Sequence, residues 1–147
     1  MLTLLLLILL GIIDFGRLLF VQQAVKSASR EGARAAVVDS GTGTVVFNAA
    51  NNSASAAAAL AGGGGALVIR ALPPGSAPGT ILPGSGTATD GSLANTAMCP
   101  ASTSDAVSVT VTVNFRWLTP VGALPGLSAP GLTGTKPVDA STTMRCE

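Results

Sequence analysis

The chain has 147 residues, of which 48% are apolar, and a formal net charge of +1. It contains no histidine, the commonest general base and metal ligand in proteins, which argues against most enzyme chemistry. The near-neutral charge and the low aromatic content argue against binding of nucleic acid and against surfaces that stack bases or sugars.

Residues 1–38 predict one long helix that begins apolar and becomes amphipathic. The run from Met1 to Ile13 carries no charge, and Asp14 and Arg17 follow it one turn apart. Further along, small apolar residues recur at helical spacing and predict a buried stripe, namely Val21, Ala24, Val25, Ala28, Gly32, Ala35 and Ala36. Such a helix is roughly 57 Å long. Since a small domain does not need that length for its own core, we expect the helix to pack against a membrane or against copies of itself.

The apolar segment 1–25 has three interpretations. A cleaved signal peptide is disfavoured, because the run lacks a basic n-region and a convincing cleavage site. A permanent transmembrane anchor fits the length of Leu2–Val25, although Asp14 and Arg17 would be costly within it. In the third interpretation, the helix lies in the membrane before assembly and in the core of a filament afterwards. For that core we expect helix packing by Leu4, Leu5, Ile8, Leu9, Gly11, Ile12, Phe15 and Leu19.

Asp14 and Arg17 are predicted to form a charge pair in the filament core, either within one helix or between subunits. A single buried polar group can fix the alignment of helices at some cost in stability. In the alternative, both side chains merely reach the membrane interface. Gly11 and Gly16 lie close by in the sequence and would let neighbouring helices approach closely.

The remainder of the chain, residues 39–147, predicts a small globular α+β domain. A second, alanine-rich helix is expected over Val45–Leu60, because a glycine run follows it at Gly62–Gly65. A short strand is expected over Ala66–Leu72, where two prolines follow.

Two long loops are predicted at residues 73–104 and 119–137. Both segments are rich in Pro and Gly, and the first adds many Ser and Thr residues. A short extra element is expected within the first loop, near Leu93–Met98.

The clearest predicted strand is Ala106–Trp117, in which apolar residues alternate with polar ones. This alternation is typical of a half-buried strand with one face on the core. Val138–Cys146 predicts a final strand. The fold class is therefore α+β: a long N-terminal hydrophobic helix, a short second helix and a small antiparallel sheet of three or four strands packed on the C-terminal half of the long helix.

No catalytic, cofactor-binding or metal site is predicted, and we expect no enzyme. Gly62–Gly65 lacks the Lys-Ser/Thr of a phosphate-binding loop, and acidic residues are scattered singly. Cys99 and Cys146 are too few and too far apart for a zinc site. An even pair in a chain of exported composition favours one disulfide over two unpaired buried thiols.

Several of these segments resemble TadE-like proteins, the pilin-like components of tight-adherence (Tad) pili. In that family an apolar run leads into G-I-I-[DE]-F-G-R and A-x-x-A-[AS]-R-E-G-A-R-A-A segments, which appear here as Gly11–Arg17 and Ala24–Ala36. The far end is similar in its valine-alternating strand, a Leu-Thr-Pro turn at 118–120 and an A-x-x-x-M-R-x-E ending at Ala140–Glu147. Such precursors usually carry a basic leader, a cleavage glycine and a glutamate at the fifth mature position. The printed sequence begins inside the apolar run, so Asp14 is the acid expected inside the core.

The resemblance implies a type IV pilin-like structural subunit that polymerises through its N-terminal helix into an extracellular Tad-like pilus on the cell surface. It implies an inner-membrane anchor before assembly. The implied partners are copies of the chain in a helical filament, other pilins and inner-membrane assembly machinery, without nucleic acid and without a cofactor. Two alternatives stay open: a minor pilin or pseudopilin for pilus assembly, and a membrane-anchored adhesion domain that never polymerises.

Overall fold

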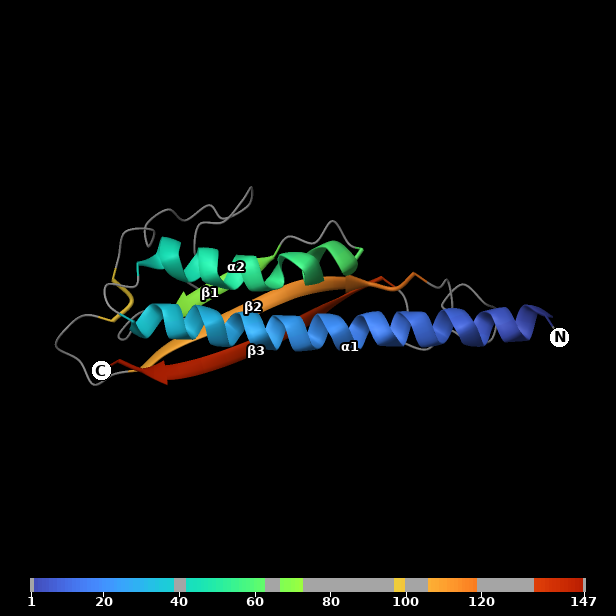
Figure 1. The fold of residues 1–147 in the computed structure, drawn as a ribbon, viewed down its shortest axis with the longest axis horizontal. Coiled ribbons are helices and arrows are strands. Elements are labelled where there is room, and N and C mark those ends of the chain that lie inside the picture. Colours follow the sequence, from blue (N-terminus) through green and yellow to red (C-terminus); the bar gives the residue numbers. More distant parts are fainter. Residues whose placement is uncertain are drawn as a thin grey trace.

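The computed structural model of the chain describes residues 2–38, 42–62, 67–72, 97–99, 106–118 and 134–146. Its elements are α1 (Leu2–Val37), α2 (Gly43–Leu60), β1 (Val68–Leu72), β2 (Ala106–Arg116) and β3 (Thr135–Arg145). The two helices cover one face of the sheet, and the N-terminal part of α1 continues beyond it (Figure 1). The predicted α+β class is confirmed, with three strands in the sheet.

The sheet is built around β2, which pairs antiparallel with β1 on one side and β3 on the other. Its apolar residues are fully buried at every second position, namely Val107, Val109, Val111, Val113 and Phe115. Between them, polar side chains point to the opposite face, where Thr110 donates a hydrogen bond to Ser141 of β3 over 3.1 Å. The alternation predicted from the sequence therefore separates a core face from a hydroxyl-rich outer face.

Several predicted bounds differ from the structure. The second helix begins at Gly43 rather than Val45, and the first strand begins at Val68 rather than Ala66. The central strand ends at Arg116 and the last strand at Arg145, each one residue earlier than predicted.

The largest correction concerns residues 135–137, which were predicted as loop and form the start of β3. Pro137 lies opposite Asn114 in the ladder. A proline is tolerated there because, within the described sheet, β3 is an edge strand and its outer side needs no backbone donor. Of the two predicted loops, residues 73–96, 100–104 and 119–133 lie outside the described residues. Of the predicted extra element, Ala97 pairs with Thr42 in an isolated bridge.

The C-terminal half of α1 forms one side of the hydrophobic core. The predicted stripe is buried at Val21, Val25, Ala28, Gly32 and Ala36, and half-buried at Ala24 and Ala35. Ser29 lies beside this stripe, fully buried, and shares a hydrogen bond of 2.8 Å with Thr142 of β3. This hydroxyl pair joins the first helix to the last strand. We use the term head for the packed part of the chain, which comprises this half of α1 with α2 and the sheet.

Gly32 marks a close approach of three elements. A Cβ at this position would lie 3.0 Å from Val109 Cγ1 of β2 and 3.2 Å from the Cβ of Ala50 in α2. Carbon atoms pack favourably at about 3.5–4.0 Å, so a methyl group there would force Val109 or Ala50 to move by a few tenths of an ångström. Glycine is needed at this point because α2 and β2 both press against α1.

We expect Gly32→Ala to lower the free energy of unfolding of the head by about 1–3 kcal/mol relative to Gly16→Ala, because an added methyl forces its packed neighbours to move. Gly16→Ala is the matched control, since a Cβ at Gly16 meets nothing within 4 Å. Thermal unfolding of the full chain in detergent, followed by circular dichroism, measures the difference. Equal midpoints for the two variants would contradict the close approach.

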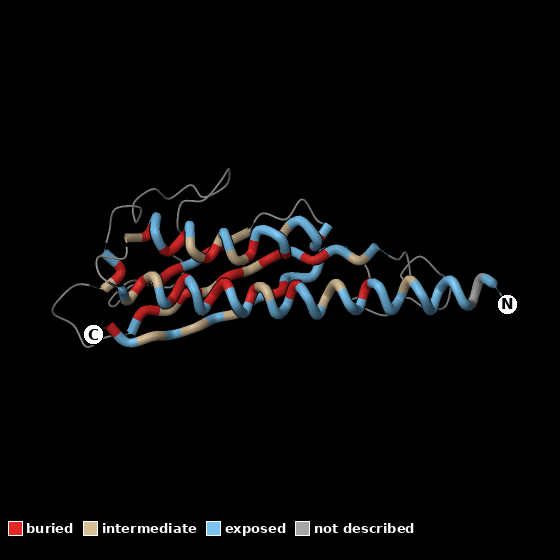
Figure 2. The backbone as a smooth tube through the Cα atoms, viewed as in Figure 1, coloured by how far each residue is buried: buried red, intermediate tan, exposed pale blue. Residues whose placement is uncertain are grey.

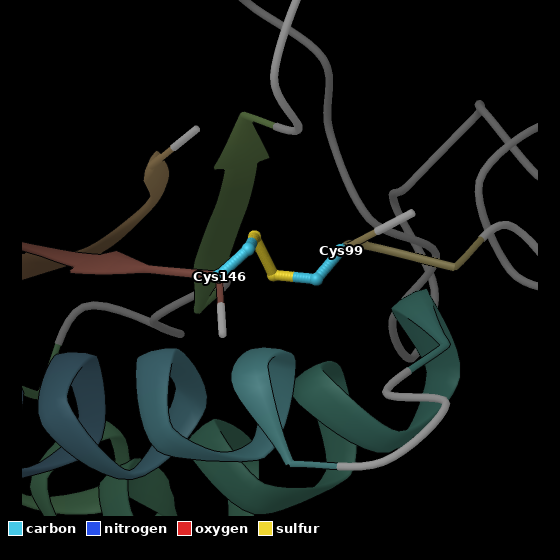
Figure 3. Close-up of a disulfide and its surroundings, with 2 residues drawn as sticks. All are labelled: Cys99 and Cys146. Carbon is cyan, nitrogen blue, oxygen red and sulfur yellow. A yellow bond between two sulfur atoms is a disulfide. The ribbon is translucent and has the colours of Figure 1, made fainter. Parts of the chain in front are cut away.

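A disulfide joins Cys99 and Cys146 at the end of the molecule opposite the N-terminus, with the Cα atoms 5.5 Å apart (Figure 3). Cys146 directly follows β3, and Cys99 belongs to the segment whose Ala97 pairs with Thr42 at the start of α2. The neighbouring Met98 is fully buried in the core. The disulfide therefore ties the end of the last strand to the region where the second helix begins.

Removing the disulfide with the double variant Cys99→Ser, Cys146→Ser should lower the free energy of unfolding by about 4 kcal/mol, the chain-entropy value for a loop of this length. Denaturant unfolding with and without reductant measures the loss, and the double variant itself should not respond to reductant. Incorporation of a thiol reagent into the native, unreduced chain would show that the disulfide is not formed.

Candidate functional site

Within the described residues, the first part of α1 is largely uncovered. From Leu2 to Phe20 most of its large apolar side chains are exposed, namely Leu2, Leu5, Leu6, Leu7, Ile8, Leu9, Ile12, Ile13, Phe15, Leu19 and Phe20, whereas Leu10 and Leu18 are half-buried. Figure 2 shows the contrast between this stretch and the C-terminal half of the helix, where buried positions recur. We name residues 2–20 the apolar stalk. A helix that is apolar on every side belongs in a membrane or inside a protein assembly.

The predicted filament-core residues all lie on this stalk. Six of them have exposed large side chains, namely Leu5, Ile8, Leu9, Ile12, Phe15 and Leu19. Gly11 is exposed with open space around it, and the side chain of Leu4 lies outside the described residues. Leu6, Leu7 and Ile13, which are not among the predicted packing residues, are exposed as well. The packing of these residues in a filament stays a prediction.

By length and composition α1 is also able to cross a membrane, and little of its apolar stretch is buried within the chain's own fold. A hydrocarbon core of about 30 Å needs about 20 apolar residues in a helix. The stalk therefore fits either of two apolar surroundings, lipid or other stalks.

Asp14 and Arg17 form an ion pair within α1, with 3.1 Å between Arg17 Nη1 and Asp14 Oδ1. Of the two predicted arrangements, within one helix or between subunits, the structure has the pair within one helix. Asp14 is only 2% exposed. The backbone N–H of Leu118, just after β2, donates a hydrogen bond to the same Oδ1 over 3.3 Å. The carboxylate is thus held both by its own helix and by the end of the central strand.

Arg17 reaches from α1 to two other elements. Its Nη2 donates a hydrogen bond to the backbone carbonyl of Leu60, the last residue of α2. The last carbonyls of a helix have no partner within it and carry partial negative charge, so a guanidinium stabilises them. The Arg17 guanidinium also lies 5.6 Å from the centre of the Phe115 ring, which Trp117 contacts edge-on at a centroid distance of 5.3 Å.

The end of α2 is shaped to accept this contact. Gly62 has a φ of +70°, the left-handed conformation in which helices commonly end. A Cβ at Gly62 would lie 3.1 Å from Arg17 Nη2, so glycine also leaves room for the guanidinium. The backbone N–H of Arg116 donates a hydrogen bond of 2.8 Å to the carbonyl of Ala61. The stalk, α2 and β2 therefore meet at one junction around the Asp14–Arg17 pair.

Sequence reasoning found the ion pair but missed its partners in the head. Leu60 is 43 residues from Arg17, and Leu118 is 104 residues from Asp14. No local pattern indicates such contacts. The one available signal was Gly62, a helix-ending glycine whose position fits the end of α2.

Residues 1–34 match the model of a protein family described as TadE-like protein, which supports the resemblance over the N-terminal helix. The match includes the stalk, the Asp14–Arg17 pair and Gly32. Searches of curated proteins and of solved structures find no match. TadE-like pilins are a structural family, and the apolar helix fits a pilin related to the Tad pilus.

Arg17→Met should lower the free energy of unfolding by about 3 kcal/mol, because Asp14 then becomes a buried carboxylate without its cation. The double variant Asp14→Leu, Arg17→Met should recover most of the loss, since no charge is left unpaired. Arg34→Met is the control, as Arg34 is exposed on the same helix. Denaturant unfolding followed by the fluorescence of Trp117 measures all four proteins. An Arg17→Met variant as stable as the wild type would disprove the structural role of the pair.

Proposed function

We propose that the chain is a structural subunit of an extracellular Tad-like pilus and polymerises through its apolar stalk. The observation that carries this proposal is the set of large apolar side chains on residues 2–20 that the described chain leaves exposed. Burial of apolar surface stabilises by about 25 cal/mol per Å². The stalk therefore needs an apolar partner, which is lipid before assembly and other stalks afterwards.

The shape of the chain supports a fibre. Stalks that pack on one another through different faces make heterologous contacts, and such contacts generate open helical filaments when the ring does not close. Gly11 and Gly16 have open space where a side chain would stand, so the backbone of a neighbouring helix can come close. The heads then form the outer layer. The TadE-like match is consistent with this arrangement, because it includes the whole stalk.

The junction gives the stalk two properties that assembly requires. Since Asp14 and Arg17 neutralise each other within one helix, a stalk that leaves the membrane for the filament carries no unpaired charge into the core. Because Arg17 and Asp14 also bind the ends of α2 and β2, the head has a defined orientation on its stalk. Identical subunits with identical orientation are what a regular helix needs. Before assembly, the expected neighbours are other pilins and the assembly machinery in the inner membrane.

Ile12→Asp should reduce the fibre protein sheared from the cell surface by about tenfold or more, because a carboxylate in the stalk core is costly. Ile12 is 66% exposed and contributes little to the head. Val45→Asp is the matched control, an equally drastic change at an exposed valine of α2, and should leave the fibre yield unchanged. Electron microscopy and quantitative immunoblotting of the sheared fraction measure the result, with the membrane fraction as the test of insertion.

Cryo-electron microscopy of the wild-type fibres, with mass spectrometry of their peptides, separates the alternatives. Fibres with stalks at the centre and this chain as the dominant peptide support the proposal. Fibres dominated by another protein would make the chain a minor pilin. Chains found only in membranes, with no fibres, would replace the proposal with an anchored adhesion domain.

A further inference from the structure

The end of the head that faces the stalk carries a distinctive group of side chains. They are Leu60 at the end of α2, Arg116, Trp117 and Leu118 at the end of β2, and Lys136 near the start of β3, and we name this group the collar. Backbone pairing places these segments next to one another: Arg116 bonds to Ala61, and Lys136 lies opposite Phe115.

The collar lies where the stalk enters the head. The backbone N–H of Leu118 donates to Asp14, and the carbonyl of Leu60 accepts from Arg17, so the collar contacts α1 at these two residues. A helix crosses the hydrocarbon core of a bilayer with about 20 residues. Because the collar contacts α1 before the apolar stalk ends, a stalk held in a membrane brings the collar into contact with the lipid.

The collar has the residue types that membrane interfaces select. Leu118 is 65% exposed and Leu60 is 45% exposed, so apolar surface continues from the stalk onto the head. Trp117 is half-buried, and tryptophan is enriched at membrane–water interfaces. Arg116 and Lys136 are exposed, and long cationic side chains can lie along apolar surface while their charges reach phosphate groups.

The charge of the collar is positive. Asp14 is buried and paired with Arg17, and within the described part of the chain neither Arg116 nor Lys136 has an ion-pair partner. Beside the collar, a groove of about 330 Å³ between α1 and β3 is lined by Lys136 of the collar, by Lys26 and by Asp139, so Lys26 and Asp139 add no net charge to that of the collar. Anionic phospholipid is the partner that complements apolar surface rimmed by these cations.

We propose that the collar docks on a membrane surface that contains anionic phospholipid, with Trp117 and Leu118 among the headgroups and Arg116 and Lys136 beside the phosphates. The head then lies against the bilayer and does not move freely above it. This docking concerns the chain before assembly and does not rest on polymerisation, because an anchored head that never polymerised would dock in the same way.

The test uses the full chain reconstituted into vesicles of phosphatidylcholine alone or mixed with phosphatidylglycerol. Trp117 is the only tryptophan of the chain, so its fluorescence reports the collar directly. In the anionic vesicles we expect a blue-shifted emission and stronger quenching by lipids brominated near the headgroup than in the neutral vesicles. High salt should reduce the difference, since it screens exposed charges.

Two variants and a matched control test the cations. Arg116→Ser and Lys136→Ser should each lower the ratio of docked to undocked heads by about fivefold in anionic vesicles, the effect of one cation near an anionic surface. Arg145→Ser removes an exposed arginine at the other end of β3 and should have no effect. Circular dichroism checks that the variants are folded.

Identical Trp117 emission in both kinds of vesicle, with full access to an aqueous quencher, would overturn the proposal. So would a Trp117 that is accessible in vesicles but protected in sheared fibres, because the collar would then contact a neighbouring subunit. The wild-type comparison decides the question even if a variant does not fold. Fibre loss or retention in Ile12→Asp has no bearing on it, so the two proposals fail independently.

Discussion

The tendency of apolar surface to avoid water divides α1 into two parts with different surroundings. In its C-terminal half, α1 buries Val21 and Val25 against α2 and the sheet. In its N-terminal half the same helix presents leucine and isoleucine side chains to its surroundings. One part of the chain is therefore complete by itself, and the other is stable only in an apolar environment supplied from outside. The remaining features are arranged around that division.

The division coincides with a rigid joint. Two charged side chains lie where the head begins to cover α1, and each bonds to the backbone of another element. Arg17 donates to the carbonyl of Leu60, and Asp14 accepts from the N–H of Leu118. A flexible linker at this point would have left the head free to rotate about its anchor. The observed contacts instead give the stalk and the head one relative orientation, which a regular polymer and a membrane-docked head both use.

Local patterns in the sequence predicted most of the helices and strands, but they could not predict contacts between elements that are distant in the sequence. The alternation of apolar and polar residues correctly predicted β2, and the long apolar run correctly predicted a helix at the N-terminus, because both patterns lie within the element itself. The start of β3 was read as loop, since Lys136 and Pro137 are poor strand residues and only their place at a sheet edge makes them acceptable. The need for glycine at position 32 depends on Val109 and Ala50 meeting there, which no periodicity contains.

The hydroxyl pair of Ser29 and Thr142 has a consequence for the order of folding. Its two residues are 113 positions apart, and they join the first helix of the chain to its last strand. Because the chain is synthesised from its N-terminus onward, α1 can enter a bilayer early, whereas β3 follows after all the other described elements. This contact forms only after β3 has been synthesised, and folding of the head carries the slow kinetics that go with contacts between remote segments. Until then, the alanine and valine stripe of α1 has no β3 to cover it, which is a period when a holdase chaperone or a neighbouring bilayer would protect it.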